Sequence, residues 1–404
     1  MEEYSPIVLK LQLLCQGVRI DPDIDSGAVG KDIKEPLRQR AGVGSGGLDM
    51  ILPEKVYCGA PVYEAFVKNS PFTLKKKRFD YIIEKNGRPI QKVAPFPRPA
   101  YYKKKCSDGT PMQRIGTIQG DTLGVSIDNR CFFWGHYKGD KMEVYKGNHC
   151  KYCAIGLNLD VTEEPRKTID QVLEVSEEAL KEDVCRHVSL NAGCFPPPDT
   201  GHEVYAEFVR ALKDRLDEYV RLSIVPPLEE KYVDIMLDSG CDLTGYNYEI
   251  FDPDLYKKIC PGKFREIDKG VAHQTYDRML QYGTKRAGKN MFMANLLAGL
   301  EPRESTVAGI EHLASMGVVP RIFVFRALTS TLMENHPMPK PEDLVYIYRH
   351  LKEICEEKYC VYKGCPGCAR VEVGTVRYLG IVPHMKEITD DDLMVAGIDP
   401  EATK

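Results

Sequence analysis

The stretch Leu123-Gly-Val-Ser-Ile127 leads into Cys131-Phe-Phe-Trp134, and Gly147-Asn-His-Cys150-Lys-Tyr-Cys153-Ala-Ile-Gly156 follows a few residues later. The first five residues are a short β-type run, after which an irregular, cysteine-bearing loop begins. A Cys-x2-Cys pair brings two thiolates within reach of one metal, and Cys131 at the strand end can supply a third. The pair alone is equally compatible with half a zinc knuckle or with plain packing, and the third cysteine favours an iron–sulfur cluster.

Around this stretch, short β-type runs alternate with amphipathic helical stretches from Ile115 onward. The runs are Leu123–Ile127, His187–Asn191, Leu222–Val225, Asp242–Tyr248, Phe292–Leu300 and Arg321–Phe325; the helical stretches are Thr168–Lys181, Glu203–Val220, Glu229–Ser239, His273–Tyr282, Glu304–Met316 and Glu342–Glu357. This alternation predicts an α/β fold with parallel strands and right-handed crossovers. We expect a partial or full β/α (TIM-like) barrel, with an open doubly wound sheet as the alternative. In either case the functional residues lie at the carboxyl ends of the strands.

The first 114 residues do not share this rhythm and are rich in glycine, proline and turns. Tyr81–Glu84 and Ile90–Val93 predict a hairpin that turns through Asn86-Gly87. Ala41–Gly47 has no strand before it and no Lys-Ser/Thr after it, so we interpret it as a flexible turn rather than a phosphate loop. We therefore predict a capping extension over 1–114, the barrel over 115–357 and a cysteine-rich, metal-binding tail over 358–404.

Composition excludes several classes of protein. The 404 residues carry a formal net charge of −4 without a long basic run, which argues against nucleic acid as a partner. No apolar stretch reaches the length of a membrane span, and the acidic start is unlike a signal peptide, so we expect a cytoplasmic protein. Because disulfides are rare in the cytoplasm, the 14 cysteines point to metal ligation or burial.

The loop Cys150-Lys-Tyr-Cys153-Ala-Ile-Gly156 after a first barrel strand resembles the cluster loop of the radical S-adenosylmethionine (SAM) superfamily, over about residues 115–357. The usual pattern there is Cys-x3-Cys-x2-Cys, whereas 18 residues separate Cys131 from Cys150 here. Such longer spacing resembles a biotin-synthase-like branch found near nitrilase-type genes. The resemblance implies that Cys131, Cys150 and Cys153 hold a [4Fe–4S] cluster whose open iron binds SAM.

The same resemblance implies a cradle for SAM at successive strand ends. Asn191-Ala192-Gly193 resembles the turn that meets the SAM amino group, although the usual glycine pair and acid are missing. The polar side chains of Asn247 and Glu249 resemble those that hold ribose, and Ala294–Glu301, with Gly299 and Glu301, resembles the segment beside adenine. Each also has a structural interpretation: Gly299 closes a strand, and Glu301 caps the helix that begins near Glu304.

A second cysteine group lies in the tail. It comprises Cys355, Cys360, Cys365 and Cys368, and Cys365-Pro-Gly-Cys368 supplies the tight turn that a metal loop needs. Four thiolates make a closed site, which suits structural zinc or a second iron–sulfur cluster, and the sequence does not choose between them. The alternative is that Cys355 only packs on the last helix.

The functional hypothesis is an oxygen-sensitive radical SAM enzyme that acts on a small molecule and takes electrons from a donor such as flavodoxin or ferredoxin. No catalytic residue, substrate or reaction type is predicted. Three alternatives stay open: a sulfur-insertion enzyme that uses a second cluster, a zinc-stabilised barrel enzyme without SAM, and a non-catalytic iron–sulfur carrier. Iron and sulfide content separates zinc from a cluster, and 5′-deoxyadenosine formation separates an enzyme from a carrier.

Overall fold

The computed structural model describes residues 4–25, 47–96, 99–138, 141–144, 147–157, 164–361, 366–375 and 385–404. The chain divides into two compact units. The first comprises Met1–Arg98, Leu297–Val307 and Ile322–Lys404, and the second comprises Pro99–Leu296 and Ala308–Arg321. The assignment of 1–114, 115–357 and 358–404 as extension, barrel and tail stays a prediction.

The strands predicted from the sequence are all present. They are β8 (Thr122–Ser126), β11 (Val188–Asn191), β12 (Val220–Ser223), β13 (Thr244–Glu249), β14 (Phe292–Ala298) and β15 (Val319–Val324). β8 pairs in parallel with β11, and β11 pairs in parallel with β12. Parallel bridges join β12 to β13, and β13 pairs in parallel with β14, which is next to β15. The predicted α/β class is confirmed, as a curled half-barrel sheet.

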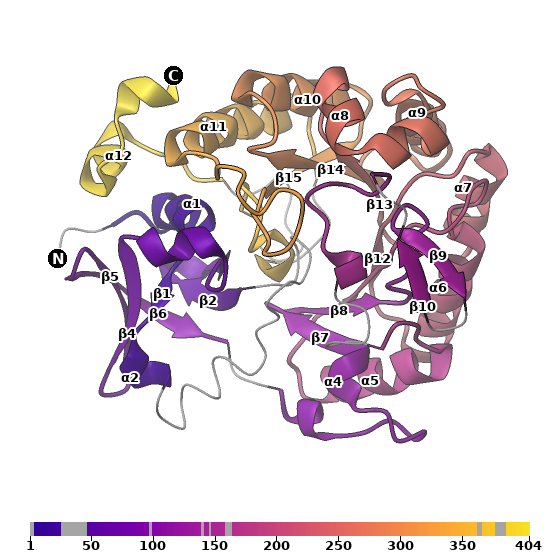
Figure 1. Ribbon diagram of the computed structural model, residues 1–404, viewed down its shortest axis with the longest axis horizontal. Helices are drawn as coiled ribbons and strands as arrows, with labels where there is room; N and C mark the ends of the chain where they lie inside the picture. The colour runs from indigo at the N-terminus through magenta and orange to yellow at the C-terminus, as the bar shows by residue number, and fades with distance from the viewer. Residues whose placement is uncertain are drawn as a thin grey trace. The chain divides into compact units, whose positions relative to one another are not determined.

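The predicted helices are also confirmed, with ends shifted by a few residues. They are α5 (Ile169–Lys181), α6 (His202–Leu216), α7 (Glu230–Asp238), α9 (Gln274–Ala287), α10 (Arg303–Ser315) and α11 (Pro341–Glu357). Helix α5 begins where Thr168 and Gln171 each accept a hydrogen bond from the other's backbone N–H, a reciprocal capping box. Figure 1 shows α5, α6 and α7 following one another along the outer side of the sheet. In the described part of the second unit, the sequence analysis missed α4 (Met112–Ile115) and α8 (Pro253–Ile259).

Alternation along the parallel strands sorts their side chains between two faces. The apolar positions are fully buried: Leu123, Val125, Val188, Leu190, Val220 and Leu222. The intervening positions on the opposite face are polar, and the register places Ser126 beside Asn191, Asn191 beside Ser223, and Ser189 beside Arg221. A sheet with helices on its apolar face therefore carries a polar concave face.

The first unit contains a six-stranded sheet in the order β1-β4-β5-β6-β2-β3. Its strands are β1 (Arg19–Ile20), β2 (Leu48–Leu52), β3 (Val56–Ala60), β4 (Phe72–Lys77), β5 (Asp80–Lys85) and β6 (Arg88–Pro95), and its helices include α1 (Pro6–Gln16), α2 (Pro22–Asp25) and α12 (Asp390–Ala396). The predicted hairpin is confirmed, since β5 and β6 pair antiparallel with Lys85 opposite Arg88. Asn86 and Gly87 have φ values of 50° and 80°, as a two-residue hairpin turn requires.

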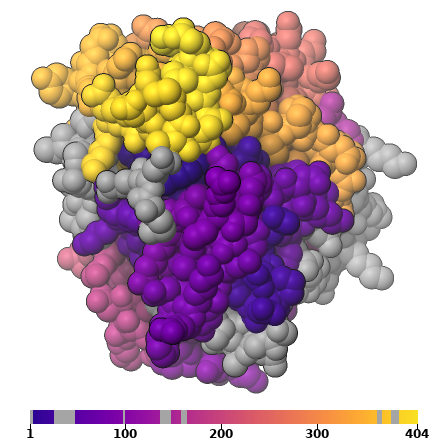
Figure 2. Space-filling model, turned by 90° about the vertical axis from the view of Figure 1, so that its left-hand side faces the viewer, coloured from indigo at the N-terminus to yellow at the C-terminus, as the bar shows by residue number. Residues whose placement is uncertain are grey.

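The C-terminal segment belongs to the same unit as this sheet. Figure 2 shows it, in yellow, against the N-terminal residues, and the carbonyl of Ala396 accepts hydrogen bonds from Gln12 (3.1 Å) and Lys85 (2.6 Å). Further along the tail, the buried amine of Lys10 donates to the carbonyls of Ala369 (2.8 Å) and Gly374 (2.6 Å). Burial lowers the pKa of Lys10 to about 7. None of the described helices combines the length and the apolarity needed to cross a bilayer.

The pH dependence of the free energy of unfolding tests whether the buried His202 of the second unit is neutral in the folded chain. His202 begins α6 with its Nδ1 atom 2.8 Å from the carbonyl oxygen of Asp199, and burial lowers its pKa from 6.5 to about 4. The unfolded chain therefore takes up a proton between pH 6.5 and 4 that the folded chain does not, so stability is lost as pH falls through this window. We expect the free energy of unfolding to fall faster in the native chain than in His202→Gln, by about 1 kcal/mol per pH unit.

Urea unfolding followed by circular dichroism at several pH values across that window measures both slopes. Parallel slopes for the two proteins would show that folding does not lower the pKa of His202.

Candidate functional site

A two-stranded hairpin accounts for the long spacing between Cys131 and Cys150. Strands β9 (Gly135–Lys138) and β10 (Lys141–Val144) pair antiparallel, with Gly135 opposite Val144. Because Gly135 and Val144 are paired, the two ends of the hairpin lie side by side. This brings Cys131, before the hairpin, near Cys150, after it. The thiols of Cys131 and Cys150 both influence Cys153 electrostatically, and Cys131 and Cys150 are each only 8% exposed. The predicted first group therefore comes together behind strand β8.

Aromatic packing and backbone hydrogen bonds hold this loop in place. The Trp134 ring stacks on His149 with centroids 4.1 Å apart, which ties the Cys131 side of the loop to the Cys150 side. Gly156 lies so close to the Trp134 ring that a Cβ atom there would approach it to 2.4 Å. The Phe132 N–H donates to the carbonyl of Cys194 (2.7 Å), which connects the loop to the turn after β11.

Gly193, one of the predicted SAM residues, makes the closest backbone approach in this region. Its N–H donates to the carbonyl of Asp128 (2.8 Å), and a Cβ atom on it would lie 2.1 Å from the carbonyl oxygen of Arg130 and 2.8 Å from the Cα of Cys131. Only glycine fits at such a distance. The turn Asn191–Cys194 therefore packs directly against the first cysteine, as its position at the carboxyl end of β11 predicts.

The turn after α8 forms the other wall of the group. Lys151 donates its N–H to the carbonyl of Ile259 (3.0 Å), and Gly262 donates its N–H to that of Asn148 (3.0 Å). A Cβ atom on Gly262 would approach the Asn148 carbonyl to 2.4 Å and the Phe133 ring to 2.7 Å. Both halves of the cysteine loop thus rest on this turn, which carries Cys260 and Lys263.

The pKa values of the thiols in this group shift in different directions. Burial raises the pKa of Cys131, and it raises that of Cys153 to about 12. The pKa of Cys150 is lowered, because the Cys260 thiol hydrogen-bonds to it and the Lys263 ammonium lies nearby. Burial raises the pKa of Cys260 well above its usual value. Cys150 is consequently the group member best prepared to become a thiolate, the form that binds metal.

Lys263 and Glu249 form a buried ion pair at the carboxyl end of β13. Lys263 Nζ lies 2.6 Å from Glu249 Oε1 and 3.1 Å from the carbonyl oxygen of Asn247, and the two side chains are 6% and 11% exposed. Glu249 follows an irregularity in the β13–β14 register and has a φ of 74°, a conformation that non-glycine residues rarely adopt. The predicted ribose-binding carboxylate of Glu249 is thus held in place by Lys263.

A polar cluster on the concave face surrounds the other predicted ribose contact. Asn295 Nδ2 donates to Ser223 Oγ (2.6 Å) and to Asn247 Oδ1 (2.7 Å), and Ser223 Oγ donates to Asn247 Oδ1 (3.2 Å). The buried Oδ1 of Asn295 accepts no hydrogen bond within the described residues. Sequence analysis missed Ser223 and did not single out Asn295 within the predicted adenine segment Ala294–Glu301, although a lone asparagine inside the apolar run Phe292–Ala298 was a usable signal.

Two predicted SAM residues, Gly299 and Glu301, belong to the first unit. Gly299 has a φ of 101°, and a Cβ there would lie 2.8 Å from Pro339. Glu301 accepts hydrogen bonds from Ser305 Oγ (2.9 Å) and Thr306 Oγ1 (3.2 Å) in the first turn of α10. These contacts match the structural alternative for both residues, and their role toward a ligand stays a prediction.

The structure describes three members of the second cysteine group. Cys355, Cys360 and Cys368 are buried, and Cys365 lies outside the described residues. A hydrogen bond with Cys360, together with burial, raises the pKa of Cys355 well above its usual value. Arg370 binds Asp49 (2.8 Å), so the segment next to Cys368 is anchored within the first unit.

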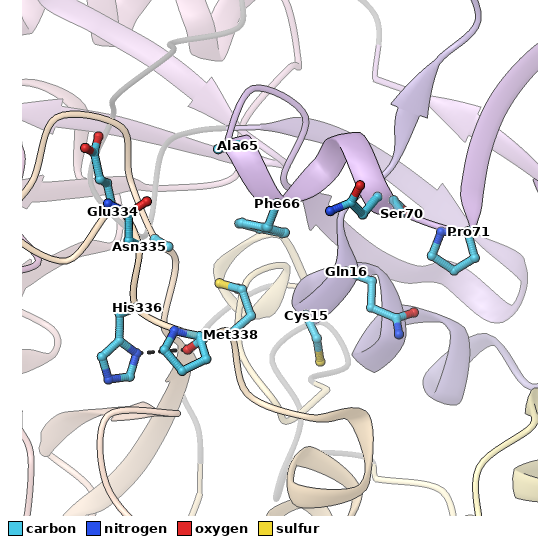
Figure 3. Close-up of a pocket in the computed structure, with 13 residues that line it drawn as sticks. Cys15, Gln16, Ala65, Phe66, Ser70, Pro71, Glu334, Asn335, His336 and Met338 are labelled. Carbon is cyan, nitrogen blue, oxygen red and sulfur yellow. Dashed lines mark hydrogen bonds between the residues drawn. The ribbon is translucent and has the colours of Figure 1, made fainter.

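The first unit also contains a cavity of about 520 Å³. Figure 3 shows Cys15, Phe66, His336 and Met338 among the residues that line it. The Cys15 thiol donates to the Leu11 carbonyl (2.9 Å), and burial raises its pKa well above its usual value. Among the described residues, none of the cysteines of either predicted group and none of the predicted SAM residues lines this cavity.

Within the described ranges, no three His, Cys, Asp or Glu side chains already form a set that could hold a metal ion. The residues around Cys150 nevertheless suit an iron–sulfur cluster with a chelating ligand. Three neighbouring thiols supply the donors, the Lys263 ammonium offsets thiolate charge, and Asn295 offers a buried acceptor to a ligand hydroxyl or amine.

Two known proteins are similar in sequence to parts of this chain. No protein-family model matches the chain. It is 24% identical over 229 residues to bacteriochlorophyllide c C-7(1)-hydroxylase of Chlorobaculum limnaeum, a match that covers 52% of this chain and 56% of the relative. It is 26% identical over 129 residues to a probable GTP 3′,8-cyclase of Methanococcus aeolicus, covering 32% of this chain and 40% of the relative. These matches confirm the predicted resemblance.

Both relatives belong to the radical SAM family, and this chain is similar to them over part of its length. The chain spans about half the length of the curated relatives it matches, 56% and 40%. The solved structure of coproporphyrinogen III oxidase from Escherichia coli, itself a radical SAM enzyme, is 12% identical and covers 43% of this chain and 41% of that one. Its TM-score of 0.33 is too low to support an argument about this chain's site.

Proposed function

We propose that this chain binds a [4Fe–4S] cluster through Cys131, Cys150 and Cys153 and cleaves SAM to start radical chemistry on a small-molecule substrate. The observation that supports this most directly is the β9–β10 hairpin. By pairing Gly135 with Val144 it joins the two ends of an otherwise discontinuous cysteine motif at the carboxyl end of β8. The bound cluster would supply the electron that converts SAM into a 5′-deoxyadenosyl radical, which takes a hydrogen atom from the substrate.

The chain's own residues would bind and orient SAM on the concave face. Asn247 lies in the second half of β13 and Asn295 lies at the middle of the neighbouring strand β14, and their side chains are hydrogen-bonded to each other. The unpaired Oδ1 of Asn295 would accept a hydrogen bond from a ribose hydroxyl or the adenine amine. Asn191, Gly193 and Glu249 complete the proposed cradle in this unit, while Gly299 and Glu301 remain proposed adenine contacts.

The substrate is proposed only as a small molecule, and the electron donor as a flavodoxin- or ferredoxin-type protein. The names of the two relatives refer to a bacteriochlorophyllide and to GTP, which belong to different substrate classes. A cytoplasmic location is likewise a proposal that follows from the oxygen sensitivity of such clusters.

The second cysteine group is proposed to bind a second iron–sulfur cluster. Cys355 and Cys360 are already in hydrogen-bond contact, and Cys368 is buried in the same unit. A chain that acquires iron for one cluster is exposed to the same metal at its other cysteine-rich loop. A second cluster would act as an electron relay or a sulfur donor.

Removing one thiol of the first group tests the main proposal. We expect three variants, Cys150→Ala, Cys153→Ala and Cys131→Ala, to lose the brown colour of the iron–sulfur cluster, because a cluster with one ligand fewer becomes labile. In each variant, the reductant-dependent formation of 5′-deoxyadenosine should fall at least about tenfold. Cys241→Ala, a buried cysteine outside the group, is the control and should retain both. Measurements are made anaerobically on reconstituted protein; full product formation in the Cys150 and Cys153 variants would refute the cluster assignment.

The SAM cradle is tested separately from the cluster. Asn247→Ala should weaken SAM binding by about tenfold, since it removes a polar contact worth roughly 1–1.5 kcal/mol, while the iron content stays at the native level. Asn335→Ala, an exposed asparagine in the first unit, is the matched control. Anaerobic calorimetry with SAM gives the affinity, and an unchanged value for Asn247→Ala would remove this residue from the cradle.

Metal analysis of a tail variant tests the second group. In Cys360→Ala/Cys368→Ala we expect about half of the iron to be lost while SAM cleavage at the first cluster continues, because one of two clusters is removed. Cys58→Ala, another fully buried cysteine of the first unit, should keep all of its iron. Loss of zinc with full retention of iron would contradict the second cluster and identify a structural zinc site.

A further inference from the structure

The cavity of the first unit is lined by segments that lie far apart in the sequence. They are residues 15–16 at the end of α1, residues 65–71 in and after η2 (Ala65–Asn69), and residues 327–338 after β15, all of which belong to one unit. Figure 3 shows side chains from these segments around the cavity. Its volume of about 520 Å³ is that of a typical small-molecule site.

The apolar part of the lining suits the carbon skeleton of a small organic ligand. Phe66 supplies an aromatic ring and Met338 a thioether, and Pro71 and Pro337 add two further apolar surfaces. Among the described residues that line the cavity, none is a lysine or an arginine. The lining therefore offers no permanent cation to a phosphate or a carboxylate, and an anionic ligand such as a nucleotide does not fit it.

The hydrogen bonds of the lining use donors and leave an acceptor. The Ser70 hydroxyl donates to the Gly17 carbonyl (2.8 Å). The Nδ1 atom of His336 lies 2.9 Å from the Pro337 carbonyl oxygen, and because a carbonyl only accepts, this nitrogen carries the proton. By contrast, the buried Oε1 of Gln16 accepts no hydrogen bond within the described residues. A ligand that donates a hydrogen bond would satisfy this oxygen.

The charges and dipoles of the lining favour a cation. Glu334 contributes a carboxylate, which accepts a hydrogen bond from the Ser330 N–H (2.6 Å) and has further lone pairs to offer. Gln16 is the last residue of α1, and the carboxyl end of a helix carries partial negative charge. The face of the Phe66 ring also attracts positive charge. A donor that is itself positively charged therefore suits the cavity better than a neutral one.

We propose that this cavity binds a small organic amine in its protonated form. The apolar body of the amine packs against Phe66 and Met338, and its ammonium group donates to Gln16 Oε1 in the field of the Glu334 carboxylate. This site goes beyond the proposed function, because it requires neither the cluster nor SAM. It can be tested on the full chain whether or not a cluster is bound.

Two probes with similar bodies and opposite charges test the class of ligand. Phenethylamine, which is protonated at about pH 8, should bind the full chain at least about tenfold more tightly than hydrocinnamate, which carries a carboxylate instead. Isothermal titration calorimetry measures both affinities. Equal affinities, or no measurable binding of phenethylamine, would overturn the proposal.

Two substitutions with opposite effects test whether the amine occupies this cavity. Glu334→Gln removes a negative charge and should weaken phenethylamine binding about threefold, whereas Gln16→Glu adds one at the acceptor and should tighten binding by about the same factor. Glu54→Gln, an exposed glutamate of the same unit, is the matched control and should bind phenethylamine as the native chain does. A misfolded protein does not gain affinity, so Gln16→Glu decides if Glu334→Gln does not fold. Native affinity in Gln16→Glu would overturn the proposal.

Discussion

Parallel strands carry their carboxyl ends to one edge of a sheet, and alternation sends successive side chains to opposite faces. In this chain the two constraints act together. The apolar side chains of β8, β11 and β12 pack against the helices, so the polar side chains of these strands lie on the concave face. Cys131, the turn at Gly193 and the cluster of Ser223, Asn247 and Asn295 then collect near that edge without any local sequence relationship between them.

In the cysteine motif, a hairpin brings residues that are far apart in sequence close together in space. Eighteen residues of open loop between two metal ligands would carry a closure entropy that grows with loop length. Pairing β9 with β10 offsets this cost with backbone hydrogen bonds and leaves only a few residues on either side of the Gly135–Val144 contact. The stacking of Trp134 on His149 then fixes the two flanks against each other.

Two buried lysines illustrate how the partner decides the charge of an interior amine. Lys10 has two backbone carbonyls as partners, and its pKa is lowered to about 7 by burial. Lys263 has the carboxylate of Glu249, and its pKa is raised. The first arrangement ties α1 to the tail within one unit, and the second ties the turn after α8 to the end of β13.

Period and spacing in the sequence determined the α/β class, the order of strands and helices, the Asn86-Gly87 hairpin and the grouping of Cys150 with Cys153, because these features depend on residues close together in the chain. The join of Cys131 to that pair, the contact of Cys260 with Cys150 and the pairing of Lys263 with Glu249 were decided only by tertiary structure. Each of these depends on the packing of segments far apart in sequence, and burial there sets charges that composition does not reveal.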